Sequence, residues 1–303
     1  MSTLAALALV AASAGPAEEP KGTVGTKAPA SAGKTELEGT GQFGTATVLV
    51  EEDEEETDAT ELKISAGGLL STGNARALAL TSLARFRLRR DIHEFRADMA
   101  GNYAQSAVDR DTDLEATVGN VQGRVRYDVF FAKRWSAFAM TTARHDPFQG
   151  LRLRLNVDPG VAFYALMKKK HRLWFEAGYD YQFDVRTRDA IIAKDDDGNP
   201  LLDPSGNTIR VEAPYLHGHA ARLFGGYTNH LSEHVTFDTG LEYLQSFLVA
   251  RRWRVNWDVA LTTSLGQRLS FATTFTMRVD NDPLPNVRKV DTITAVNLVV
   301  SII

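Results

Sequence analysis

The chain has 303 residues, and its 34 lysine and arginine residues stand against 38 aspartate and glutamate residues, a formal net charge of −4 at pH 7. This near balance gives no reason to expect a nucleic-acid partner. Cysteine is absent, which excludes disulfides, thiolate metal sites and cysteine nucleophiles. The longest apolar run, residues 4–12, is far shorter than the roughly 18 residues of a transmembrane helix. A barrel of membrane-spanning strands would escape that test, because half of each strand faces a polar interior.

The N-terminal apolar run is followed by Ala12-Ser13-Ala14, a small-residue pattern typical of a cleavage site. We therefore expect residues 1–14 to be a secretory signal peptide, although no lysine or arginine precedes the apolar run. Residues 15–59 are rich in Gly, Ala, Pro, Thr and Glu, and residues 51–58 alone hold seven acids. Such a segment has too little apolar surface to offset the entropy of ordering. We predict a disordered acidic periplasmic tail.

The remainder of the chain consists of segments in which apolar and polar side chains alternate. The clearest example is residues 251–280, two alternating arms joined by a few turn residues. On the first arm Trp253 and Trp257 fall on one face, whereas Arg254 and Asp258 fall on the other. A period of two indicates β-strands. Each arm exceeds the ~5 to 6 residues of an average soluble strand and reaches the ~9 to 11 of a transmembrane strand.

Twelve such segments follow one another, and their faces are mostly unambiguous. Trp135 and Phe138 in the fifth segment cannot share a face without a bulge, so its register is ambiguous. Pro159 in the sixth segment predicts a bulge, because proline removes a ladder donor. The segments lie near residues 62–71, 78–88, 94–103, 120–129, 135–144, 151–163, 172–185, 216–227, 235–243, 252–265, 269–280 and 290–303.

The links between the segments sort by parity. Links after even-numbered segments are short, whereas those after odd-numbered segments include the longer ones. Outer-membrane barrels have short periplasmic turns and longer external loops. We therefore predict that residues 60–303 form an all-β, closed, antiparallel, up-and-down transmembrane barrel of about 12 strands, preceded by the disordered tail.

In such a barrel the apolar face contacts lipid and the polar face lines the lumen. The alternative is a soluble sandwich or lipocalin-like barrel with these faces reversed. Strand length, aromatic residues near segment ends and mixed charge signs on one face favour the membrane barrel. The predicted lumen-lining residues, which offer a path for solutes or ions, are Glu94, Arg96, Asp98, Arg124, Arg126, Arg152, Arg154, Glu176, Asp180, Arg254 and Asp258.

Four blocks of the sequence stand out: LLSTGNAR (69–76), GRVRYDVFFAKRWSAFAM (123–140), RHDPFQGLRLRLNVDPGVAFYAL (144–166) and NDPLPNVRKVDT (281–292). Together they resemble the YdiY-like family of salt-induced outer-membrane β-barrel proteins, a family of unknown function. The resemblance covers roughly residues 61–303. It implies a monomer in the outer membrane of a Gram-negative bacterium, inserted by the outer-membrane assembly machinery, and it supplies no catalytic residue. The chain departs from that route in ending with Ile303, where such barrels usually have an aromatic residue.

Two acidic stretches, KDDDGNP at 194–200 and DPSGN at 203–207, raise the question of calcium binding. Gly198 follows Asp197 directly, which does not meet the ligand spacing of an EF-hand loop. We interpret both stretches as turns of an external hairpin.

Four of the histidines could in principle hold a metal. His217 and His219 share a face of one predicted strand, and His230 and His234 lie near the next turn. Link parity places the two pairs a strand-length apart, so we predict no metal site and no cofactor.

The sequence thus predicts an outer-membrane barrel that has an envelope structural role or is a narrow passive channel for small solutes. About eight strands leave a filled interior and about sixteen make an open pore, so twelve does not decide. No G-x-S-x-G motif occurs, and we do not expect an enzyme. The alternatives are a barrel-embedded hydrolase acting on lipid or peptide, with a catalytic set assembled from separate strands, and a soluble β-barrel binding protein.

Overall fold

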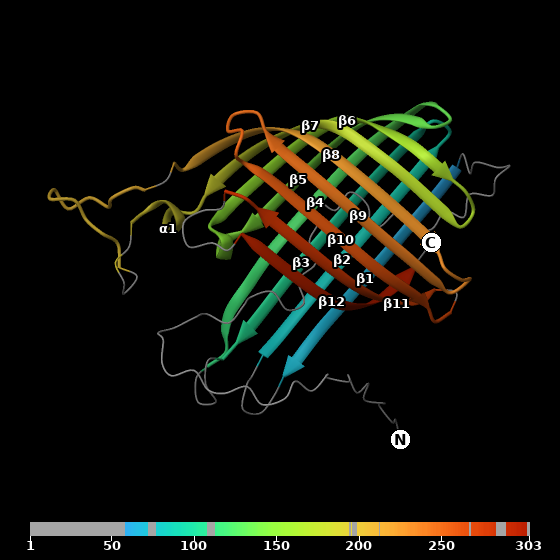
Figure 1. Ribbon diagram of the computed structural model, residues 1–303. Coiled ribbons are helices and arrows are strands. Elements are labelled where there is room, and N and C mark those ends of the chain that lie inside the picture. The colour runs from blue at the N-terminus through green and yellow to red at the C-terminus, as the bar shows by residue number, and fades with distance from the viewer. Residues whose placement is uncertain are drawn as a thin grey trace, which may run out of the picture.

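The computed structural model describes residues 58–71, 77–107, 113–193, 195, 199–211, 213–266, 268–282 and 289–301. In these residues twelve antiparallel strands form one closed barrel, in which consecutive strands pair and β12 pairs with β1 (Figure 1). The predicted fold class is confirmed. The strands are β1 (Asp58–Ser71), β2 (Ala77–Arg90), β3 (His93–Ser106), β4 (Glu115–Ala132), β5 (Trp135–Asp146), β6 (Leu151–Met167), β7 (His171–Arg186), β8 (Tyr215–His230), β9 (Val235–Ser246), β10 (Trp253–Ser264), β11 (Leu269–Asp280) and β12 (Val290–Ser301).

The first strand begins inside the segment that was predicted as tail. Asp58 pairs with Arg90 of β2, and the ladder continues without interruption to Ser71 and Ala77. The described barrel therefore starts two residues before position 60, because β2 is long enough to pair with those residues. The predicted signal peptide and residues 15–57 of the tail lie outside the described residues.

The links differ in length at the two ends of the barrel, as the sequence predicted. At one end, which we call the short-turn end, the links are residues 91–92, 133–134, 168–170, 231–234 and 265–268. At the opposite, long-loop end they are residues 72–76, 107–114, 147–150, 187–214, 247–252 and 281–289. Residues 147–150 contain the short 3-10 helix η1 (Pro147–Gln149), and residues 187–214 contain the helical turn α1 (Arg188–Ile191), which lies beyond the barrel at the left of Figure 1.

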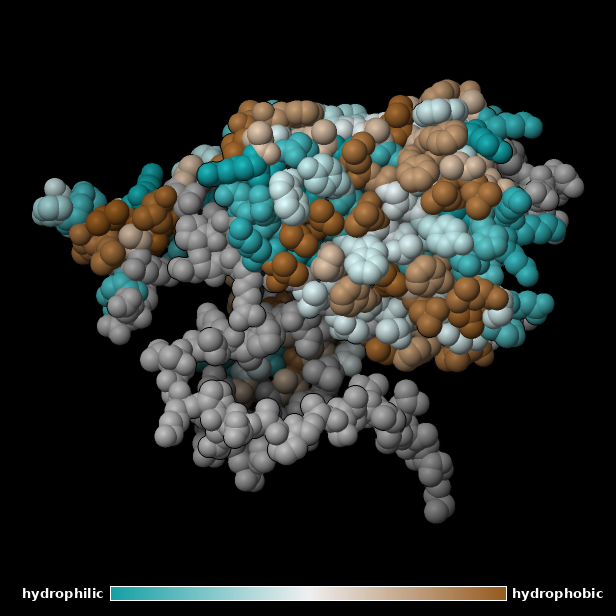
Figure 2. Space-filling view, in the orientation of Figure 1, coloured by the Kyte–Doolittle hydropathy of each residue, from teal (hydrophilic) through white to brown (hydrophobic). Residues whose placement is uncertain are grey.

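The outward face of the barrel is apolar. Leu80, Met99, Val125 and Leu223 all expose large hydrophobic side chains on it. Figure 2 shows apolar side chains over the middle of the visible outer face, with hydrophilic ones gathered at the right-hand rim, where the short turns lie. Exposed apolar side chains around a charged interior are the reverse of a soluble barrel and fit a lipid-facing surface.

Among the described residues, no helix is both long and apolar enough to cross a membrane.

The register of β5 needs no bulge to accommodate its aromatic residues. Phe138 is buried inside, whereas Trp135 faces outward and packs against Phe163, with ring centroids 4.7 Å apart. The bulge predicted at Pro159 is wrong: β6 keeps one register with β7 on both sides of it, and Ala139 of β5 pairs with it. A missing proline donor removes a single ladder bond, which two long flanking ladders tolerate.

Candidate functional site in the barrel lumen

The lumen is lined by every second residue of each strand, and the register decides which side chains are neighbours. Ser136 of β5 pairs with Ala162 of β6, which in turn pairs with Glu176 of β7. Glu176 pairs with Phe224 of β8, and Phe224 with Glu242 of β9. All five side chains are buried. Rows of this kind bring residues that are distant in the sequence into one layer across the interior.

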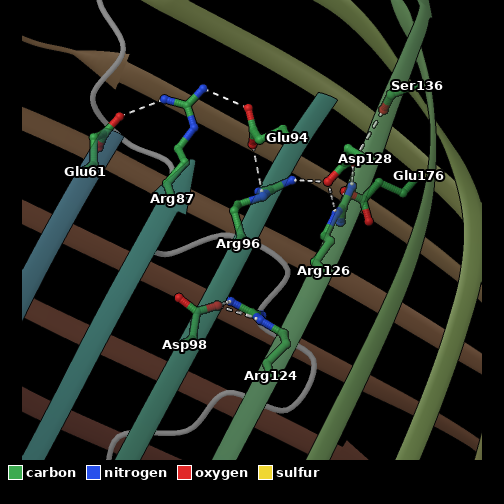
Figure 3. A network of polar contacts seen from close by, with 10 residues as sticks. All are labelled: Glu61, Arg87, Glu94, Arg96, Asp98, Arg124, Arg126, Asp128, Ser136 and Glu176. Carbon is green, nitrogen blue, oxygen red and sulfur yellow. Dashed lines mark hydrogen bonds and ion pairs between the residues drawn. The ribbon is translucent and has the colours of Figure 1, made fainter. Parts of the chain in front are cut away.

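Ten charged side chains from β1, β2, β3, β4, β7, β8 and β9 form a continuous series of alternating sign, which we call the charge belt. Consecutive members are joined by contacts of 2.6 to 3.1 Å. Figure 3 shows the belt from Glu61 to Glu176, with Glu94 and Asp128 each bridging two arginines. In order, the belt consists of Lys63, Glu61, Arg87, Glu94, Arg96, Asp128, Arg126, Glu176, Arg222 and Glu242.

One contact of the charge belt crosses the lumen. Arg126 Nη1 on β4 donates to Glu176 Oε1 on β7 at 2.7 Å, although β5 and β6 lie between these strands in the barrel wall. Below it, the Phe138 ring centroid is 4.0 Å from the Arg126 guanidinium carbon, a cation–π geometry. A Cβ on Gly160 would lie 2.6 Å from that ring, so the ring needs glycine there. The ion pair and the Phe138 ring therefore fill the part of the lumen beside β5 and β6.

An apolar cluster accompanies the charge belt inside the barrel. Tyr164, Trp174 and Phe224 belong to it, and the guanidinium of Arg172 lies 4.9 Å and 5.3 Å from the first two ring centroids. Aromatic side chains on the inward face interrupt the alternation of polar and apolar residues in the sequence. An inward residue of this kind cannot be distinguished by its polarity from an outward one. The cluster consists of Phe138, Met140, Ala162, Tyr164, Trp174 and Phe224.

Burial makes the pairing in the charge belt energetically important. Arg222 is 1% exposed and Asp128 0%, and the most accessible side chains, those of Lys63 and Glu61, are 20% and 19% exposed. A buried charge that loses its partner costs about 3 to 5 kcal/mol. Since five cations and five carboxylates alternate, the belt carries no net charge, and each member contacts at least one neighbour of opposite sign.

Two further ion pairs contain residues that the sequence assigned to the lumen. Arg124 Nε donates to Asp98 Oδ2 at 2.8 Å, and Arg85 Nε lies 3.6 Å from the same carboxylate. Arg154 holds Asp184 through two parallel hydrogen bonds of 2.7 and 2.8 Å. A fork of this kind is the strongest geometry for an arginine and a carboxylate.

The last three predicted residues that the structure places inside lie toward β10. Asp180 accepts a hydrogen bond from Asn156 Nδ2 at 2.7 Å, and Arg254 Nη2 lies 3.7 Å from its other oxygen. Asp258, 1% exposed, accepts a hydrogen bond from the Thr276 hydroxyl at 2.6 Å. The structure therefore has Glu94, Arg96, Arg126 and Glu176 in the charge belt, and Asp98, Arg124, Arg154, Asp180, Arg254 and Asp258 around it.

Arg152 is the exception, and its predicted place in the lumen is wrong. The register between β6 and β7 shifts between Leu151 and Leu153, so that Leu151 is buried, 4% exposed, and Arg152 lies on the exposed face. Its carbonyl oxygen contacts His145 Nδ1 at 2.7 Å. One extra residue at a bulge reverses the parity of everything before it in the strand.

Sequence reasoning missed several members of the charge belt. Arg87 and Asp128 lie on the polar faces of their strands, so the alternation of β2 and β4 could have identified them as lumen residues. Arg222 and Glu242 carried a weaker signal, since the apolar Phe224 of β8 and Leu244 of β9 share the inward faces of their strands. Only the register identifies these two as partners, through the 2.6 Å contact from Arg222 Nε to Glu242 Oε1.

The inward face of β10 and β11 differs from the rest of the lumen, and we call it the polar wall. Thr274 and Thr276, at the middle of β11, are only partly buried, as are Asn256 and Thr262 of β10. Short side chains cannot reach across the interior as arginine and glutamate do. These four side chains are therefore partly exposed, whereas Asp258, Ala260 and Ala272 on the same wall are buried.

The histidine pairs lie at opposite ends of the barrel, as link parity predicted. His217 Nδ1 is 2.8 Å from the Tyr181 hydroxyl, and His219 contacts Tyr179, both near the long-loop end. His230 and His234 flank the turn between β8 and β9 at the short-turn end. In the described part of the chain, no three potential ligands form a group that could hold a metal ion.

The turn predicted at residues 203–207 is confirmed. The Asp203 carboxylate accepts backbone N–H groups from Asn207 at 2.9 Å and Ser205 at 2.8 Å. These donors, Asn207 first, lower the pKa of Asp203 below its usual value. Gly206 takes φ of 81°, which favours glycine. The carboxylate thus serves the turn itself.

Residues 64–302 match the model of a family described as "Protein of unknown function, DUF481", nearly the span of the resemblance noted in the sequence. No curated protein matches the chain. Among solved structures it is similar to the NanC porin (13% identity, covering 80% of this chain and 98% of the porin, TM-score 0.42). It is also similar to the KdgM porin in complex with disordered oligogalacturonate (10% identity, 80% and 99%, TM-score 0.41) and to an outer-membrane channel from Pseudomonas putida F1 (11% identity, 83% and 100%, TM-score 0.40). Likeness at this level carries no information on function.

Proposed function

The chain belongs to the DUF481 family of proteins of unknown function, and we propose that it is a monomeric outer-membrane barrel that serves as a narrow passive channel for small solutes. Its apolar outer face would contact lipid, with the short-turn end in the periplasm of a Gram-negative cell. Insertion would depend on the outer-membrane assembly machinery. The apolar exterior and the difference between the two sets of links support this location.

One observation carries the channel proposal: the lumen is filled on one side and accessible on the other. The charge belt and the apolar cluster occupy the interior beside β1 to β9, whereas Thr274 and Thr276 of β11 stay partly exposed at mid-barrel. A passage beside the partly exposed threonines would be narrower than an unfilled twelve-stranded lumen. It would admit water, ions and small polar solutes and exclude large ones.

Planar-bilayer recordings test the proposal directly. We expect small conductance steps from the purified wild-type barrel and larger steps from the Arg126→Ala/Glu176→Ala double variant, because it removes the contact that crosses the lumen. Arg152→Ala, which alters the exposed face, is the matched control and should conduct like the wild type. Absence of steps from both wild type and double variant, with both folded, would overturn the channel.

The second candidate is a filled barrel with a purely structural role, and the burial of the neutral charge belt favours it. Measuring the accessibility of introduced thiols distinguishes this barrel from a channel. The chain has no cysteine, so single substitutions are unambiguous. In vesicles, we expect a water-soluble maleimide to modify Thr274→Cys on the polar wall. Ser136→Cys, at a position 0% exposed, should stay unmodified. Protection of both positions would favour a purely structural role in the envelope.

Fractionation tests the location. The protein should sediment with outer membranes, require detergent for extraction, and migrate differently on gels before and after heating. Recovery in the soluble fraction without detergent would contradict the proposed membrane location.

A further inference from the structure

Arg186, the last residue of β7, has a buried guanidinium that finds no partner in the described part of the chain. The residue is 8% exposed, and its Nε and Nη1 atoms have no hydrogen-bond acceptor among the residues that the structure describes. It alternates along β7 with the buried Gln182 and Asp184, and it therefore points into the lumen. Its position at the strand end places it at the long-loop mouth of the barrel.

The neighbours of Arg186 are already paired with one another. On the adjacent strands its row contains Leu151 and Asp146. Arg144 Nη2 donates to Asp146 Oδ2 at 2.7 Å and to Gln149 Oε1 at 3.0 Å.

In the next row inward, Arg154 holds Asp184 through two hydrogen bonds. This part of the mouth therefore contains three arginines against two carboxylates, and the excess positive charge resides on Arg186.

The long-loop side of this position is covered by backbone. Gly150, which follows η1, accepts a hydrogen bond from Thr187 N at 2.9 Å. A Cβ on Gly150 would lie 2.5 Å from the Cβ of Ala190 in α1, so the two segments are in close contact. Access is from the lumen, where the Arg154 side chain is 18% exposed in the row below.

We propose that Arg186 binds an oxyanion, the carboxylate or phosphate group of a small solute, at the long-loop mouth of the lumen. An unpaired buried charge costs several kcal/mol, which a bound anion would offset. The N–H donors of one guanidinium match the oxygens of a carboxylate or phosphate in spacing and plane. Arg144 and Arg154 are neutralised by their own carboxylates, so Arg186 supplies the charge of the site. The site does not depend on whether the lumen conducts.

Isothermal titration of the full-length barrel, folded in detergent, tests the site with inorganic phosphate and, separately, acetate. The two titrations distinguish a preference for phosphate from one for carboxylate. We expect saturable binding of one anion per barrel by the wild type, and a loss of affinity of about tenfold or more in Arg186→Gln. Arg152→Gln removes an arginine at the same height but on the exposed face, and it should bind like the wild type.

A second variant, expected to raise the affinity for the anion, keeps the proposal testable if Arg186→Gln does not fold. Asp184→Asn removes one of the two nearby carboxylates while keeping its shape, so it should tighten anion binding by about a few fold. Arg186→Lys should keep part of the affinity because it keeps the charge. Absence of saturable binding by the wild type, equal binding by Arg186→Gln, or no gain in Asp184→Asn would each overturn the proposal. None of these measurements depends on conductance, so the channel and the anion site can fail separately.

Discussion

The lumen has two unlike sides on one continuous sheet. Beside β3 to β8, which we call the filled wall, Arg222 is 1% exposed and Glu176 3%. On the polar wall of β10 and β11, the Arg254 side chain is 26% exposed, and the threonines at mid-strand are partly exposed as well. Both sides share the same alternation of faces. Their inward side chains differ in length, and this decides whether the interior is filled.

Length and charge act together in this difference. Arginine and glutamate reach the next strand or across the lumen, where each finds a partner of opposite sign. Threonine and serine end close to their own strand. Because a long charged side chain is stable at low dielectric only when it is paired, the filled wall requires a complete series of partners, whereas the threonines and serines of the polar wall do not. Substitutions should therefore be costly on one wall and mild on the other.

The largest effect is expected from Asp128→Ala. This carboxylate contacts Arg96 at 2.8 Å and Arg126 at 2.8 and 2.9 Å. Its removal leaves two buried guanidiniums short of a partner and should lower the free energy of unfolding by about 3 to 5 kcal/mol. Reversible urea unfolding of the barrel in lipid vesicles measures the change. Thr262→Ala, on the polar wall, is the control and should change stability by less than about 0.5 kcal/mol. Equal losses in the two variants would remove the distinction between the walls.

The outer face gives the next largest effect. Trp257 lies outside the polar wall, 37% exposed, and its indole N–H donates to Thr239 Oγ1 at 3.0 Å. Trp257→Arg places a charge near mid-bilayer and should cost about 2 to 4 kcal/mol. Trp135→Arg, at the short-turn rim outside the filled wall, should cost about 0 to 1 kcal/mol. The same unfolding measurement compares them. A negligible loss for Trp257→Arg would mean that this face does not contact lipid.

The smallest effect concerns space alone. Thr142 on β5 is 5% exposed between Arg124 and Asn156, whereas Thr262 on β10 is partly exposed. Leucine at position 142 overfills the filled wall and should cost about 1 to 3 kcal/mol. Thr262→Leu should leave the free energy of unfolding nearly unchanged, because the side chain at this position is only partly buried. Melting or urea midpoints of the two variants provide the test, and a larger loss for Thr262→Leu would reverse the assignment of the two walls.

The inward residues of β3 show what the alternation of polar and apolar residues can predict. Glu94, Arg96 and Asp98 were assigned to the lumen from their period of two, and the structure places all three there. Arg152 was assigned by the same reasoning and lies outside. The difference is a register shift in β6, which depends on pairing with β7 and leaves no signature in the alternation of β6 itself.

The sequence by itself determined the strands, the outward side of most of them, the parity of the links and the closed barrel, because the alternation of side chains and the turn residues are local properties of the chain. Only the tertiary structure decided which charges meet. The pair of Arg126 and Glu176 spans two intervening strands, and the pairings around Arg186 leave it without a partner among the described residues. Such contacts depend on the register of every strand between them and on barrel closure, so they follow from the whole sheet and from no single segment.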